Sequence, residues 1–341
     1  MALSSGKRAL LAVAVLLLLA AGAAGIVLYR MHRPLPPASA GKPPDIMSLL
    51  PPDAPVVIYI DADALRGLQG SPLAAVLGLA SPGPKEDRDY AQFVQETGFD
   101  YTRDLDHAAI AVWPAGLATQ ANPAGDDRAT ILADGHFDQK KIAAYALRTG
   151  RAENRGSQTV YEVPGKPPVA FEFLSPDRIE LASGNDPVAL LSSANPLPRD
   201  PVMQDRISRV AGAPIFGVAR MDQLPESFYS NFRNAPQLNH YIRSLRALSL
   251  AGKPSGDRID LALDAECDSM KNAVEISTLL ETFRMIGAVA ISDPRARGQM
   301  TREQYDFART FLKQLKISPQ ARWVRLSFEV TPEMLRQTTP R

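Results

Sequence analysis

Five side chains in the first third of the chain are of the types that bind metals or transfer protons. Asp61 and Asp63 follow one apolar run, and Asp104, Asp106 and His107 precede another. If the two segments met, carboxylates and an imidazole would form an Asp/His site for metal or acid–base chemistry. Aspartate is equally usual as a helix cap or in a turn, and both segments are predicted to be such places. We therefore favour the structural interpretation of these five residues.

Three further positions carry reactive types. His136 and Glu266 occupy corresponding places in two similar segments, and both could bind a metal, but both also suit an exposed strand end. Cys267 is the only cysteine, so no intramolecular disulfide forms. A cysteine nucleophile is conceivable, yet the setting at a strand end favours a small buried apolar residue.

Local motifs give no support for a cofactor or metal. The turns at Gly41-Lys-Pro, Gly165-Lys-Pro and Gly252-Lys-Pro lack the glycine spacing of a phosphate loop. The sequence contains neither H-E-x-x-H nor G-x-S-x-G. A triad can still form from distant residues, so an enzyme is disfavoured, not excluded.

The elements that must position these residues begin with an apolar run, Ala9–Leu28, free of charge and proline. As a helix it is about 30 Å long, the thickness of a bilayer's hydrocarbon core. We predict a retained signal-anchor in the inner (cytoplasmic) membrane, with residues 1–8 as a short cytoplasmic tail and the body outside the cytoplasm. The alternatives are a signal peptide cleaved near Ala21-Gly22-Ala23 and, least favoured, a buried helix of a soluble protein.

A proline-rich segment, residues 29–52, follows the run and predicts a semi-rigid tether. The remaining body has ordinary globular composition, with 45% apolar and 22% charged residues in the whole chain. The net charge of +1 argues against a nucleic-acid partner, because such proteins usually carry a basic patch.

Strands and helices alternate along the body, which predicts an α+β fold with mainly antiparallel sheets. Asp63 and Asp138 are expected to cap helices that run to about Leu79 and Arg148. The expected strands are 56–60, 107–113, 129–137, 158–163, 169–174, 178–182, 214–219, 247–250, 258–265 and 322–330. The other expected helices are 89–97, a short one from 186, 237–243, 270–290 and 301–316.

The strongest of these patterns predict the core. In the helix 270–290, apolar residues at helical spacing should face a sheet: Ile276, Leu280, Phe283 and Ile286. In the strand 322–330, alternation should bury Val324, Leu326 and Phe328 and leave the residues between them on the opposite face.

Residues 127–143 and 257–273 agree without a gap at six positions. The matched pairs are Asp127/Asp257, Arg128/Arg258, Asp134/Asp264, Asp138/Asp268, Lys141/Lys271 and Ala143/Ala273. Each copy reads as a strand, an Asp cap and a helix. We therefore predict two related α+β units, 53–200 and 210–332, with a C-terminal tail at 333–341; chance agreement of short amphipathic segments is the alternative.

Three short segments carry a resemblance to known proteins. Leu50–Asp61, Glu96–Asp100 and Arg103–Asp106 resemble segments of bacterial envelope proteins of unknown function, which have one anchor or signal and a duplicated α+β body. The resemblance covers mainly residues 49–113. It implies location and fold, and no catalytic residue.

Together these patterns predict a non-enzymatic, membrane-tethered extracytoplasmic domain that binds a protein or an envelope component. Its contact with the membrane is through residues 9–28, and no cofactor, metal or nucleic acid is expected. One alternative is an extracytoplasmic enzyme that uses the Asp/His cluster. The other is a binder of lipid or another apolar ligand between the two units.

Overall fold

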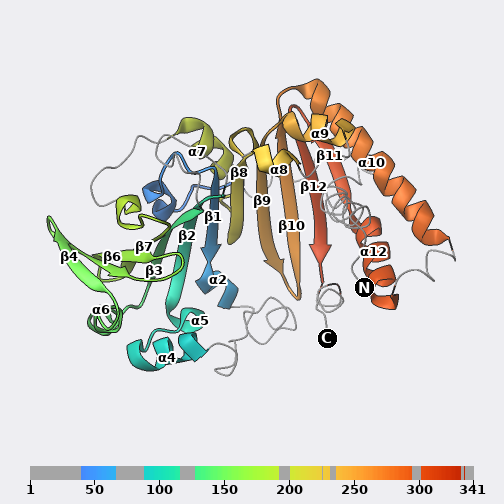
Figure 1. Cartoon of the computed structure of the whole chain (residues 1–341). Helices are drawn as coiled ribbons and strands as arrows, with labels where there is room; N and C mark the ends of the chain where they lie inside the picture. Colours follow the sequence, from blue (N-terminus) through green and yellow to red (C-terminus); the bar gives the residue numbers. More distant parts are fainter. Residues whose placement is uncertain are drawn as a thin grey trace, which may run out of the picture. The chain divides into compact units, whose positions relative to one another are not determined.

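The computed structural model describes residues 40–66, 88–115, 127–191, 200–224, 226–230, 236–293, 301–331 and 334 (Figure 1). The predicted anchor 9–28, the tail 1–8 and most of the tether lie outside these residues, as does the predicted helix beyond Arg66. Among the described helices, none is both long and apolar enough to cross a bilayer. The chain forms two compact units. We call Ser39–Ala219 with Gln223–Pro225 the N-terminal unit, and Arg220–Asp222 with Glu226–Arg341 the C-terminal unit.

The N-terminal unit is built on an antiparallel sheet with the strand order β8-β1-β2-β3-β7-β6-β5-β4. Its strands are β1 (Val56–Asp61), β2 (Leu105–Trp113), β3 (Arg128–Gly135), β4 (Arg151–Arg155), β5 (Gln158–Val163), β6 (Val169–Ser175), β7 (Arg178–Ser183) and β8 (Ile215–Arg220). The α+β class and the antiparallel sheet are therefore as predicted.

Short helices cover this sheet: η1 (Asp45–Leu49), α2 (Ala62–Arg66), α4 (Arg88–Thr97), α5 (Tyr101–Asp104), α6 (Gln139–Ala146), η2 (Val188–Leu190) and α7 (Pro201–Ser208). On one face, Ile142 of α6 packs in a cluster with Ala133 and Ile179. Asp138 caps α6 by accepting a hydrogen bond from the N–H of Lys141, as predicted. The cap expected at Asp63 is wrong by two residues, because Asp61 accepts the N–H of Ala64 instead.

The C-terminal unit has its own antiparallel strands in the order β9-β10-β12-β11. They are β9 (Leu245–Ser255), β10 (Arg258–Cys267), β11 (Lys316–Gln320) and β12 (Trp323–Val330). The helices of this part of the chain are η3 (Met221–Gln223), α8 (Glu226–Ser230), α9 (Pro236–Arg243), α10 (Met270–Ser292) and α12 (Arg302–Gln314).

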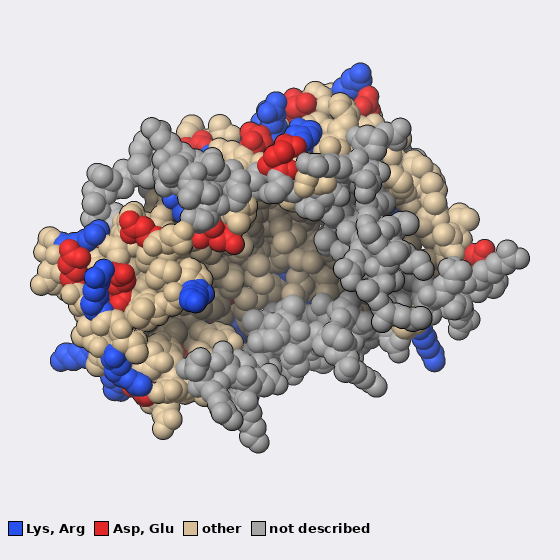
Figure 2. Space-filling view, viewed as in Figure 1, with Lys and Arg blue, Asp and Glu red and all other residues tan. Residues whose placement is uncertain are grey.

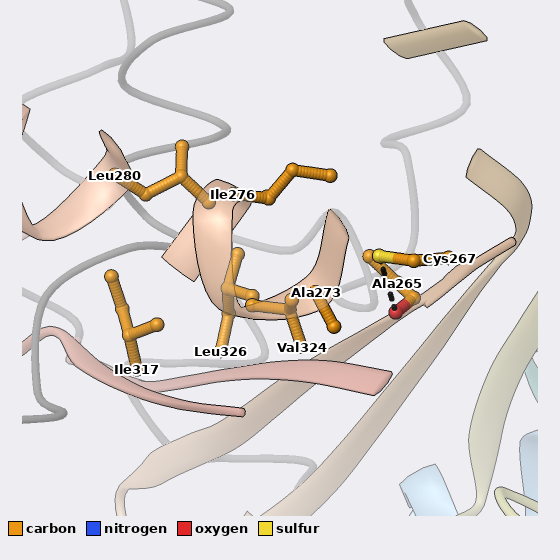
Figure 3. Close-up of a cluster of buried hydrophobic side chains, with 8 residues drawn as sticks. All are labelled: Ala265, Cys267, Ala273, Ile276, Leu280, Ile317, Val324 and Leu326. Carbon is orange, nitrogen blue, oxygen red and sulfur yellow. Dashed lines mark hydrogen bonds between the residues drawn. The ribbon is translucent and has the colours of Figure 1, made fainter. Parts of the chain in front are cut away.

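The core of the C-terminal unit lies between α10 and its sheet (Figure 3). Ile276 and Leu280 of α10 pack against Val324 and Leu326 of β12, together with Ala265, Cys267, Ala273 and Ile317. The prediction is confirmed for these four residues. It is wrong for Ile286, which is 59% exposed. At 100° per residue, Ile286 lies about 120° around the helix from Leu280 and so leaves the buried face.

β12 also departs from the predicted half-buried pattern. Trp323 and Arg325 are buried although they alternate with Val324 and Leu326, so both faces of the strand are covered there. Phe328 is only partly buried and packs edge-on against Phe311 of α12, with ring centroids 5.3 Å apart.

The two units share a connection order. In each, a strand pairs with the next one along the chain (β2 with β3, β9 with β10), and a helix follows (α6, α10). The strand before that helix (β3, β10) then pairs with a later strand (β7, β12), which in turn pairs with the strand before it (β6, β11). The caps differ: Ser269, not the predicted Asp268, caps α10 by accepting the N–H of Asn272.

The core assignment can be tested by truncating one buried and one exposed side chain. We expect Leu326→Ala to lower the free energy of unfolding by about 2–5 kcal/mol, because it removes buried contacts and leaves a cavity. Ile286→Ala should change it by less than about 0.5 kcal/mol. Denaturant unfolding of the purified variants measures both values, and equal losses would show that the assigned core is wrong.

Candidate functional site

Four polar residues form a row across the N-terminal sheet. Asp61 of β1 lies opposite His107 of β2, His107 lies opposite Asp134 of β3, and Asp134 lies opposite Arg178 of β7. Directly opposed residues share a face of an antiparallel sheet, so the four side chains stand on one face. It is the face away from α6, because Ala133 and Ile179, the neighbours of Asp134 and Arg178, pack on that helix.

His107 is the centre of this row. Its Nδ1 lies 3.2 Å from the Tyr59 hydroxyl and 3.6 Å from Oδ1 of Asp61. Burial raises the pKa of Tyr59 to about 12, and the negative charges of Asp61 and Asp134 add to this effect. Tyr59 thus stays protonated and can donate to a neutral imidazole. Tyr59 and Asp61 both lie next to Nδ1 of His107. In a catalytic triad, by contrast, a carboxylate binds one ring nitrogen and the nucleophile binds the other, so this arrangement is not a triad.

The row of four polar residues ends in a bidentate ion pair between Arg178 and Asp134. Arg178 donates from Nε to Oδ1 of Asp134 at 2.5 Å and from NH2 to Oδ2 at 2.8 Å. The hydrogen bonds that Arg178 donates to Asp134 raise the pKa of Arg178. Bidentate pairs of this kind are strong and directional, so this one fixes the side chains on both strands.

A second arginine gathers two of the predicted site residues. Arg66 of α2 donates to Oδ1 of Asp63 and to Oδ1 of Asp106, each at 2.9 Å. The same guanidinium donates to the carbonyl of Leu105 at 2.5 Å. Asp63 and Asp106 are therefore joined through a cation and do not converge on an empty position between them.

Asp104 is turned to a different partner. Arg103 donates to both of its carboxylate oxygens, at 2.7 and 2.6 Å, and the N–H of Asp100 donates to Oδ2 at 2.8 Å. The hydrogen bonds from Arg103 are the main cause that lowers the pKa of Asp104. The side chain of His136 is exposed, with Nδ1 3.8 Å from Asp106.

These contacts define what the cluster can do. The five predicted residues lie near one end of β1 and β2, but an ion pair or hydrogen bond engages each of them. No group of three or more His, Cys, Asp or Glu side chains in the described ranges is arranged to hold a metal. The arrangement is suited to fixing the ends of β1, β2 and β3.

Sequence reasoning missed Tyr59, Arg66 and Arg178. The spacing of Asp63 and Arg66, three residues apart in a helix, was the one local signal available. The pairing of Asp134 with Arg178 depends on strand register across 44 residues, which the sequence does not display.

The C-terminal unit contains a similar ion pair. Arg325 of β12 donates from Nε to Oδ1 and from NH2 to Oδ2 of Asp264 of β10, each at 2.6 Å. These residues are directly opposed, buried, and on the face away from α10. The two strands have an irregularity in their pairing at Gly135 of β3 and at Cys267 of β10. Asp134 lies one residue before this point and Asp264 lies three residues before it, a difference of two residues. A two-residue shift keeps the same face.

Neither Cys267 nor Glu266 is arranged for chemistry. Burial raises the pKa of the Cys267 thiol to about 12, so it is not a thiolate at ordinary pH. Glu266 is buried and lies 2.9 Å from NH2 of Arg322.

A different feature stands out on α10. Among the described residues, five of the ten exposed large apolar side chains belong to this helix. We call them the α10 stripe: Met270, Val274, Met285, Ile286 and Val289. Thr278 and Thr282 donate their hydroxyls to carbonyls of the preceding turn, at 2.9 Å each. Figure 2 shows mainly uncharged surface along α10, with charged side chains near its first turns.

The terminal strands offer a poorer surface for a partner. β4, at one end of its sheet, is exposed throughout and carries Arg151, Glu153 and Arg155. Charges of both signs are interspersed over this region (Figure 2). β11 carries Pro319, which has no N–H to donate. Charges and proline are the usual protection of an edge against pairing with another chain.

Comparisons with known proteins identify no relative. No family model and no curated protein matches the chain. The structure of crystal form IV of TP0453 is similar with a TM-score of 0.45 and 11% identity, over 85% of this chain and 94% of that one. Crystal form III gives a TM-score of 0.45 and 10% identity, over 89% and 96%. At these values the similarity supports no inference about this chain.

The bond network of Asp104 predicts a pH dependence. A carboxyl whose pKa is lowered by folding adds stability above its unfolded pKa, about 3.9, and loses it as the pH falls through the folded pKa. We expect Asp104→Asn to destabilise the protein at pH 7 and to differ much less from the parent near pH 3. Asp63→Asn, at an exposed position, is the control. Unfolding measured at both pH values tests this, and a constant difference for Asp104→Asn would contradict it.

Proposed function

We propose that this protein is a non-enzymatic binding module, held outside the cytoplasm by residues 9–28, that docks on a protein or envelope component through the α10 stripe. The observation that carries the proposal is the exposure of the stripe on one surface helix. Single exposed apolar residues are normal, whereas several exposed apolar side chains gathered on one surface helix are a feature of interaction sites.

The hydrogen bonds of the acidic residues support the proposal that the protein is not an enzyme. An active site needs groups that can exchange protons or ligands with a substrate. Here Arg66, Arg103 and Arg178 hold the carboxylates in hydrogen bonds that they would have to break first.

The anchor is proposed from the sequence. The run Ala9–Leu28 is long enough to span, and the tail with Lys7 and Arg8 favours the cytoplasmic side for the N-terminus. The proline-rich tether then separates the folded body from the bilayer.

Topology can be tested with a protease. We expect a protease added to cells with a permeabilised outer barrier and an intact inner membrane to digest the body. The body should also sediment with membranes after an alkaline wash, because the anchor is retained. Protection from the protease would contradict the orientation, and a mature N-terminus near Ala24 would contradict retention.

We also propose that the two units arose by duplication. The shared connection order, the strand-to-helix step after β3 and β10, and the cross-strand pairs Asp134–Arg178 and Asp264–Arg325 support this. Two observations show that the units do not correspond residue by residue. The carboxylate–arginine pairs differ in position by two residues, and the helices have different caps, Asp138 and Ser269. A duplication with later adjustment in the strands accommodates both sets of observations.

The docking role can be tested in intact cells. A photo-crosslinking residue at Met285 should form an adduct, because that side chain lies in the stripe and is 44% exposed. The same group at Leu147, 48% exposed in the N-terminal unit, is the matched control and should form none. Adding Val289→Glu should abolish the Met285 adduct without changing the melting temperature. Equal adducts at both positions would refute a specific docking surface.

A further inference from the structure

We infer that the α10 stripe, together with basic residues of α12 in the same outer layer, docks on the surface of an anionic lipid bilayer. The inference rests on the proposed function, because it names the envelope component that the stripe binds. It is argued below from the position of the two helices, the chemistry of each outer face and the length of the tether.

The two helices cover the same face of their sheet. Val324 and Leu326 of β12 pack against α10, and Phe328 packs against Phe311 of α12. These three positions alternate along one strand, so they share a face. Gly287 of α10 also faces Leu312 of α12, where an added Cβ would lie 3.3 Å from Cδ1. The sides of α10 and α12 turned from the sheet therefore belong to one outer layer of the C-terminal unit.

The outer side of α10 carries the stripe and, in its first turns, Lys271 and Glu275, which lie 3.8 Å apart as an ion pair. Val289 is 73% exposed and Met270 is 63% exposed, so the stripe extends over nearly the whole helix. The hydroxyls of Thr278, Thr282 and Ser292 all donate to carbonyls one turn earlier. Such a face can enter the boundary between headgroups and acyl chains without leaving polar groups unpaired.

The outer side of α12 is basic. Arg302, Arg309 and Lys313 are exposed, and their spacings of seven and eleven residues place them on one line of the helix. Asp306, 3.8 Å from Arg302, is the acidic neighbour on that line. Apolar side chains combined with cations on one surface are the pattern of binding to anionic lipid, where each cation contributes to binding.

The chain itself favours a bilayer over other occupants. About twelve residues separate Leu28 from the start of the described body, or roughly 40 Å when extended as a proline-rich segment. If Ala9–Leu28 spans, the tether keeps the body within this distance of the bilayer surface. Docking is then an intramolecular step with a high effective concentration, so even a weak surface is occupied.

The experiment uses the full chain in vesicles. Val289→Cys and, as a matched control, Val202→Cys on α7 are labelled with an environment-sensitive fluorophore. Cys267 is buried, and the unsubstituted chain shows any labelling there. Vesicles contain phosphatidylcholine alone or with phosphatidylglycerol, each with and without lipids that carry a quencher in the acyl chain. An alkaline wash separately reports whether residues 9–28 hold the chain in the bilayer.

We expect the label at 289 to shift to the blue and to be quenched by the lipids in vesicles with phosphatidylglycerol, and the label at 202 to remain unquenched. Replacing Arg302, Arg309 and Lys313 by Gln should weaken docking about fivefold for each cation removed. High salt should act in the same direction.

Other outcomes divide the two proposals. A chain that resists the wash but is not quenched at 289 overturns docking and leaves the tether in place. A chain that is washed off but is quenched in anionic vesicles supports docking and overturns the tether. A blue shift without quenching indicates that a second copy of the chain covers the stripe and overturns the lipid assignment, as does equal quenching at 289 and 202.

Discussion

The cross-strand bond between a carboxylate and a guanidinium is the interaction on which the arrangement of each sheet depends. In both units the middle strand must find a partner far along the chain: 44 residues separate Asp134 from Arg178, and 61 separate Asp264 from Arg325. A slip of one residue in the pairing would turn every side chain of β7, or of β12, to the opposite face of its sheet. We infer that the bidentate pair specifies the register, because a slipped strand would leave a partly buried charge at Asp134, or a buried one at Asp264, without its partner.

The same register determines where the residues of the predicted Asp/His cluster lie and which partners they bind. Once Asp134 is fixed opposite Arg178, His107 and Asp61 follow on the neighbouring strands and form one row with them. Arg66 then closes the end of the sheet by joining Asp63 to Asp106. Residues that suggest catalysis by type alone are thus part of a bonded end of the sheet.

The sequence was informative where a pattern is local and failed where it depends on partners. Periodicity located α10 and β12, and an Asp before a helix located the cap of α6, because these signals lie within one turn or one strand. The fully exposed strand β4 has no alternation to detect, and β11 contains a proline, so both were missed. Arg325 was expected on an open face but is buried, since only the fold supplies Asp264.

In α10 the residues that the fold requires and the residues that the fold leaves unconstrained lie on opposite faces of one helix. Its inner face is constrained by packing, which is why Ile276 and Leu280 could be predicted and why they reveal nothing of function. Its outer face packs against no other described element, yet it carries Met285 and Val289. Polar residues at these exposed positions would make the protein more soluble. An apolar choice that the fold does not require calls for another cause. Docking on an anionic surface, as proposed, would account for both helices, because the basic line of α12 lies in the same layer.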